Sequence, residues 1–132
     1  MKNNSFGFTF IELMIALAIF AIILLTIAGM QIAAIRANAF ANKMTTAVIL
    51  AEDKLEELKG LPYNDGQLTD DGDTNDLLDI ENPDHQDDPG EGYTRMWNIA
   101  DDTPVSGTKT VAVIVGWENW EHKVEIQTII AR

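Results

Sequence analysis

The feature that most constrains this chain is an apolar run over residues 8–30, in which Glu12 is the only charged residue. About 20 consecutive apolar residues in a helix span a hydrocarbon core of roughly 30 Å. The run is apolar on all faces, whereas a helix that lies on a membrane surface has one polar face. A cleaved signal peptide is the nearest alternative, but its apolar region is only about 7–15 residues long. The run therefore predicts a membrane-spanning helix.

The helix is expected to continue past the membrane. Residues 31–59 contain no proline or glycine and are rich in helix-forming Ala, Leu, Glu, Lys and Met. An apolar stripe follows a spacing of three and four residues: Val48, Ala51, Leu55 and Leu58. Gly60 and Pro62 then supply a stop. We therefore divide the helix into a membrane half, residues 8–30, and an exposed half, residues 31–60.

Residues 61–91 are acidic and are expected to form a loop rich in Asp, Asn, Gly and Pro. Asp71, Asp73 and Asn75 copy the first three ligand positions of an EF-hand calcium loop. The match fails further on, because Asp76 replaces the glycine and Asn82 the final glutamate. Two expectations stay open: a solvated acidic loop, or an irregular Ca²⁺ site. The ligands of that site would be Asp71, Asp73, Asn75 and Asp76, with Asp79 as a further candidate. No other cofactor is expected.

Residues 92–132 predict a small antiparallel sheet. Tyr93, Trp97 and Ile99 share one face of the first strand, and residues 108–117 are apolar on both faces, as in a central strand. The last segment alternates Val124, Ile126, Thr128 and Ile130 with polar residues. The apolar stripe of the long helix is the expected cover of the sheet, which gives an α+β head.

The composition argues against catalysis and against nucleic-acid binding. The net charge of −12 and the pI of about 4.3 disfavour a polyanionic partner. The chain has no cysteine to act as a nucleophile or to form a disulfide. His85 is expected to be a solvated loop residue, and His122 to begin a strand or end a turn. Trp97, Trp117 and Trp120 are expected to pack rather than to bind a ligand, so we expect no enzyme activity.

The residues from Gly7 onward resemble the N-terminal signature of type IV prepilins: a glycine followed by FTFIELMIALAIFAIILL. In that family a membrane prepilin peptidase cuts after the glycine, and the new N-terminal residue is then methylated. The resemblance makes residues 1–7 a cleaved leader, Gly7–Phe8 the scissile bond and Phe8 the methylated residue. It also implies the type IV pilin fold, in which the second half of a long helix packs on an antiparallel sheet.

Glu12 matches the near-invariant glutamate of the family. An ionised carboxylate within lipid costs at least about 2.5 kcal/mol, and a cation offsets that cost. The resemblance suggests the amine of Phe8 in a neighbouring subunit, in a pair that fixes the axial register between subunits. The alternative is that Glu12 lies near the interface and reaches the headgroups. We expect Glu12 to be an assembly contact.

The end of the long helix, AEDKLEELKGLPY, resembles that of minor pilins of the PilV type and pseudopilins of the GspI type. The matching residues are Ala51, Lys54, Leu55, Glu56 and Leu58. The resemblance implies a structural subunit, most simply a minor pilin, that polymerises through its apolar helix. The alternatives are a pseudopilin of a type II secretion or DNA-uptake system and a membrane-anchored calcium-binding module.

The partners that the resemblance implies are other pilin subunits, the prepilin peptidase and methyltransferase, and the inner-membrane assembly platform. Lys2 precedes the span and the polar head follows it, which weakly favours a cytoplasmic leader. The expected topology is thus a single pass through the inner membrane with a periplasmic head. The subunit would then pass into an extracellular filament.

Overall fold

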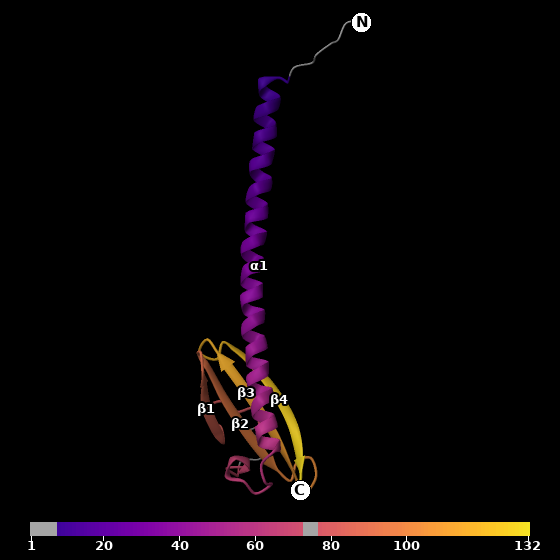
Figure 1. Ribbon diagram of the computed structural model, residues 1–132, viewed down its shortest axis with the longest axis vertical. Coiled ribbons are helices and arrows are strands. Elements are labelled where there is room, and N and C mark those ends of the chain that lie inside the picture. Colours follow the sequence, from indigo (N-terminus) through magenta and orange to yellow (C-terminus); the bar gives the residue numbers. More distant parts are fainter. Residues whose placement is uncertain (1–7, 73–76) are drawn as a thin grey trace. The chain divides into compact units, whose positions relative to one another are not determined.

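The computed structural model describes residues 8–72 and 77–132, and its elements are shown in Figure 1. They are the helix α1 (Phe10–Lys59), a short 3-10 helix (Gly66–Leu68) and the strands β1 (His85–Gly90), β2 (Tyr93–Asp101), β3 (Thr108–Trp117) and β4 (His122–Ala131). The chain divides into two compact units, Met1–Ala41 and Asn42–Arg132. The predicted α+β class, one long N-terminal helix and an antiparallel sheet, is confirmed.

The described part of the first unit is helical almost throughout. α1 begins at Phe10, two residues after the expected start at residue 8. Every residue from 8 to 41 is exposed to solvent, including the large apolar side chains. A helix that is apolar all round is stable only where lipid or other helices cover it. The first unit is therefore built for burial outside its own chain.

The second unit is a meander of four antiparallel strands in the order β1-β2-β3-β4, against which the last turns of α1 pack. Trp97 of β2 is opposite Val113 of β3, which is opposite Ile126 of β4. From Lys109 to Trp117 every residue of β3 is buried, which confirms the prediction of a central strand.

The core lies between α1 and one face of the sheet. The helix contributes Ala47, Ala51, Leu55 and Leu58, so Ala47 replaces the predicted Val48, which is only half-buried. The sheet contributes Tyr93, Trp97, Ile99, Val111, Val113, Val115 and Trp117. Full burial of a large apolar side chain contributes about 1.5–3 kcal/mol. This helix stripe therefore holds the head together.

The prediction of a loop over all of residues 61–91 is wrong at its end, because residues 85–90 form β1. Asp, Pro and Gly disfavour strands, but tertiary contacts override that preference. Asp87 accepts two hydrogen bonds from Arg95, at 2.8 and 2.6 Å. His85, expected to be a solvated loop residue, stacks on Trp97 with ring centroids 5.2 Å apart.

Two lysines are buried on the helix side of the sheet, where the sequence predicted only apolar packing. Lys54 is 4% exposed and donates to Glu57 and Gln67. Lys109 is 6% exposed and donates to Asp101 and to the carbonyl of Leu68. Buried charges need partners of this kind. The chain thus places cations inside a head whose surface is acidic.

Candidate functional site

The first turn of α1 holds Glu12 in a capping box with Thr9. The Glu12 carboxylate accepts hydrogen bonds from the backbone N–H and the hydroxyl of Thr9, both at 3.1 Å. In return the Glu12 N–H donates to the Thr9 hydroxyl at 3.3 Å. This is the reciprocal pattern by which Thr and Glu, three residues apart, satisfy N–H groups that have no partner within the helix.

The capping box gives Glu12 a role within its own chain that the assembly hypothesis did not include. An unsatisfied backbone N–H in hydrocarbon costs several kcal/mol, so the carboxylate offsets part of its own insertion cost. The sequence contains the signature of a capping box, because residues 9–12 read T-x-x-E ahead of an apolar run. The structure also places Phe8 fully at the surface, 89% exposed. Gly7 lies outside the described residues.

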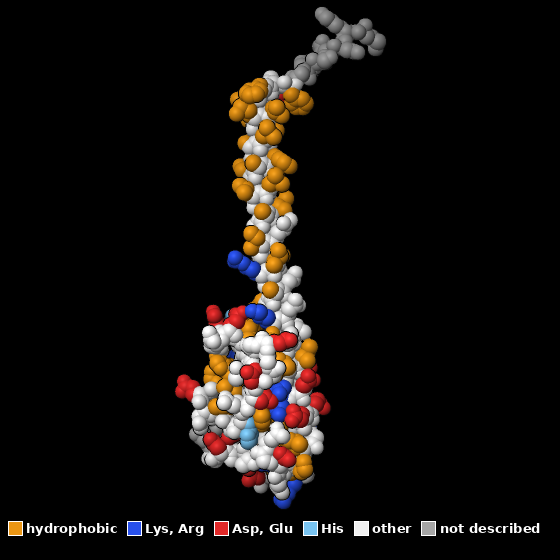
Figure 2. Space-filling view, turned by 60° about the vertical axis from the view of Figure 1, so that its left-hand side comes forward, with side chains coloured by type: hydrophobic (Ala, Val, Ile, Leu, Met, Phe, Trp, Pro, Cys, Tyr) orange, Lys and Arg blue, Asp and Glu red, His pale blue; other side chains and the backbone are white. Residues whose placement is uncertain are grey.

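The helix after this cap presents apolar side chains on every side. Figure 2 shows them along the part of the helix that precedes the head. Thr26, one of the few polar residues there, donates its hydroxyl to the carbonyl of Ile22 at 3.0 Å, which satisfies it inside the helix. α1 is the one described helix long and apolar enough to cross a membrane.

The proposed calcium ligands lie mostly beyond what the structure describes. Asp73, Asn75 and Asp76 are outside the described residues, so the predicted ligand set stays a prediction. Asp71 lies beside Asp70 and Asp84, with one carboxylate oxygen of each within 4.8 Å of the others. The carboxylates of the latter two also accept backbone hydrogen bonds, which tie this segment to β2. Asp84 accepts from Ile99 at 2.7 Å, and Asp70 accepts from Asp101 at 3.2 Å.

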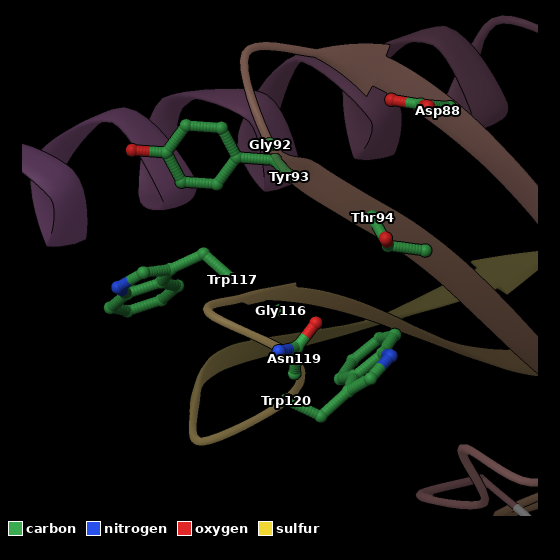
Figure 3. Close-up of a pocket in the computed structure, with 8 residues that line it drawn as sticks. All are labelled: Asp88, Gly92, Tyr93, Thr94, Gly116, Trp117, Asn119 and Trp120. Carbon is green, nitrogen blue, oxygen red and sulfur yellow. The ribbon is translucent and has the colours of Figure 1, made fainter.

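A pocket of about 200 Å³ lies at the end of the sheet where β1 meets β2 and β3 meets β4. Figure 3 shows the residues that line it. Its floor is Gly116, on which the ring of Trp120 lies. A Cβ at Gly116 would fall 2.2 Å from that ring, so only glycine fits there. Trp120 thus packs on the sheet, and Trp97 and Trp117 belong to the core, as the sequence predicted for all three.

The turn that carries Trp120 is strained and is held to α1 by an ion pair. Glu118, Asn119 and Trp120 have φ of 54°, 56° and 67°, a region that side chains disfavour. Lys43 of α1 donates a hydrogen bond to Glu118. That bond raises the pKa of Lys43 and lowers the pKa of Glu118. His122 begins β4, as expected, and its Nε2 lies 3.5 Å from Glu118.

This ion pair is expected to stabilise the turn over a limited range of pH. The contribution of Glu118 is present above its ordinary pKa of 4.5 and is lost as the pH falls through its lower folded pKa. The contribution of Lys43 is present below its ordinary pKa of 10.5 and is lost as the pH rises through its higher folded pKa. A carbon-detected NMR titration should place the Glu118 midpoint below 4.5. Lys43→Met should raise that midpoint, and an unchanged midpoint would rule the pair out in solution.

A comparison with known families matches residues 2–28 to the prokaryotic N-terminal methylation motif. The matched segment includes Gly7, Phe8, Thr9 and Glu12, together with the first half of the exposed apolar helix. No curated protein and no solved structure matches the chain significantly.

This motif is the signature of type IV prepilins, and within residues 2–28 it supports a type IV prepilin-like protein. The function that the motif supports is that of a structural subunit, either a pilin or a pseudopilin. The motif implies processing by a prepilin peptidase and assembly with other pilin subunits. With the apolar helix, it supports anchoring in the inner membrane.

Proposed function

We propose that this chain is a minor pilin: a structural subunit that is cut at Gly7–Phe8, methylated at Phe8 and built into a type IV pilus through its apolar helix. The observation that supports this most is the capped helix itself. The helix begins within the matched methylation motif, and from residue 8 to residue 41 all of its apolar side chains are exposed. In a filament core those side chains would exchange lipid contacts for contacts with neighbouring helices.

The hydrogen bonds of Glu12 support a role in assembly. One carboxylate oxygen accepts from Thr9, and the other faces no donor among the described residues. A methylated Phe8 amine from an adjacent subunit would pair with that second oxygen. Within lipid or a dry helix bundle, such a charge-assisted bond is stronger than a neutral one. Glu12 would then cap its own helix and bind its neighbour.

The membrane topology is part of the same proposal. The leader would face the cytoplasm and the head the periplasm, until the assembly platform extracts the subunit into an extracellular filament. The head then exposes its acidic surface, part of which Figure 2 shows. Aspartates and glutamates outnumber lysines and arginines by 21 to 9 in the chain, so the exposed surface of such a filament would be strongly anionic.

Mass spectrometry of the native N-terminus tests the proposal, on sheared surface filaments and on membranes separately. N-methyl-Phe8 in the sheared fraction would support a pilus subunit. The same peptide in membranes alone would favour the alternative, a pseudopilin of a secretion or DNA-uptake system. An intact Met1 in both fractions would refute processing and favour a membrane-anchored module, whose acidic segment should then be tested for Ca²⁺ binding.

Gly7→Leu should abolish processing, because a side chain at this position obstructs the approach of the peptidase to the backbone. The expected result is a chain that keeps residues 1–7, which intact-mass measurement of the membrane fraction would show. Ser5→Leu is the matched control, since it adds the same side chain two residues earlier and should be cut normally. Normal cleavage of Gly7→Leu would refute the assigned bond.

A further inference from the structure

The two edges of the sheet differ in how open they are to a further strand. β1 is six residues long, contains Pro89 and has an irregular register between Asp87 and Gly90. Proline and bulges protect an edge from pairing. β4 is ten residues long, has no proline and keeps an unbroken register with β3 from Ala131 to His122. Within the described chain β4 pairs with β3 alone, so its outer edge has the form of a template for pairing.

The middle of β4 has a hollow on each face of the sheet. On the helix side a hollow of about 310 Å³ is lined by Ile126 of β4 and by four residues of α1: Glu52, Leu55, Glu56 and Lys59. On the other side a hollow of about 370 Å³ is lined by Thr110 and Ile129. Gln127 and Thr128 border both hollows. Neighbouring side chains of a strand point to opposite faces, so one added strand would reach both.

We propose that the outer edge of β4, residues 124–131, binds an extended segment of a different protein chain by strand addition. Backbone hydrogen bonds to the edge would supply affinity, and the two hollows would select alternate side chains. This interaction does not depend on the pilus assignment, because it uses the head alone.

The charges on the helix side specify a basic side chain in the bound segment. Two carboxylates, Glu52 and Glu56, and one cation, Lys59, line that hollow, and all three are exposed. Lys59 pairs with Glu56 at 2.9 Å, whereas Glu52 has no salt bridge to any described residue. A lysine or arginine of the bound segment, if it faced the helix, would supply the cation that Glu52 lacks.

The other face specifies an apolar side chain. Ile129 is 55% exposed and is the only strongly exposed large apolar residue in the described strands. An apolar side chain beside it would remove that surface from water, which favours binding.

A second copy of this chain does not fit the same edge. Its β4 would present Val124, Ile126, Thr128 and Ile130 on one face and only Lys123 as a cation on the other. It would also bring a second set of acidic side chains to Glu52 and Glu56. The bound segment therefore belongs to a different chain, with alternating basic and apolar residues.

The test uses the full chain in neutral-detergent micelles and a short synthetic peptide of alternating Lys and Val. Two further peptides carry N-methyl groups on either the Lys amides or the Val amides. Successive residues of a strand direct their N–H groups to opposite edges, so only one methylated set faces β4. One methylated peptide should therefore lose at least about tenfold in affinity, while the other binds as the parent does. Hydrogen exchange should show protection of β4 amides by the parent.

Matched variants locate the site. Ile129→Lys should weaken binding about tenfold, whereas Val105→Lys, at an exposed apolar residue off the edge, should not. Glu52→Lys should weaken binding more than Asp53→Lys, which makes the same charge change outside the hollow. Equal binding of all three peptides, or equal effects within each pair of variants, would overturn the proposal.

Discussion

Glu12→Val should leave membrane insertion and leader cleavage intact and remove the chain from sheared filaments. Valine adds no polar group to the apolar helix, so insertion becomes easier. The variant cannot pair with a neighbouring amine, and it also loses the acceptor for the Thr9 N–H. Immunoblots of the membrane and sheared fractions, with the intact mass of each, measure both effects.

Glu12→Gln separates the two roles of this carboxylate. The glutamine amide oxygen still accepts from the Thr9 N–H, since Glu and Gln both serve in a capping box, but it carries no charge. If assembly needs an ion pair with Phe8, the Gln variant is absent from filaments, as the Val variant is. If capping alone matters, the Gln variant is incorporated and the Val variant is not.

Thr9→Ala is the control for the local structure. It removes the hydroxyl that accepts from Glu12 and costs the helix end about 1 kcal/mol, but leaves the charge in place. It should therefore assemble, at a reduced level at most. Normal incorporation of both Glu12 variants would refute the assembly role.

The long helix and the central strand could be predicted because their patterns are periodic and local. An apolar run of membrane length predicts a spanning helix. β3 is apolar on both faces because it lies at the centre of the sheet. Alternation likewise predicted β2 and β4. The processing residues came from a short N-terminal motif, which the family comparison then matched.

β1 and the buried lysines could not be predicted, because distant residues decide them. Residues 85–90 read as a loop, but they pair with β2, and the bidentate contact of Asp87 with Arg95 and the stacking of His85 on Trp97 support that pairing. Lys54 reads as one more charge on a helix, yet it lies over the Trp97 ring at 4.2 Å. Strand propensity depends on such neighbours more than on the residue itself.

Trp97 should be the most sensitive core position of the head, because three elements meet on its ring. The ammonium of Lys54 in α1 lies over the ring, and His85 of β1 stacks on it. The indole N–H of Trp97 donates to the carbonyl of Gln67 at 2.9 Å. Trp97→Ala should lower the free energy of unfolding by about 3–5 kcal/mol. The whole free energy of unfolding of a small domain is about 5–15 kcal/mol. Urea unfolding of the full chain in neutral-detergent micelles, followed by near-UV circular dichroism, measures the loss.

Two further variants make this prediction specific. Trp97→Phe keeps most of the apolar packing but loses the hydrogen bond to Gln67, so its cost should be intermediate. Trp120→Ala removes an indole that is half-exposed and lies outside the core cluster, and should cost only about 1 kcal/mol. Because both alanine variants delete the same side chain, their difference isolates burial and the contacts of Trp97. Equal losses would mean that Trp97 does not join helix, segment and strand as the structure shows.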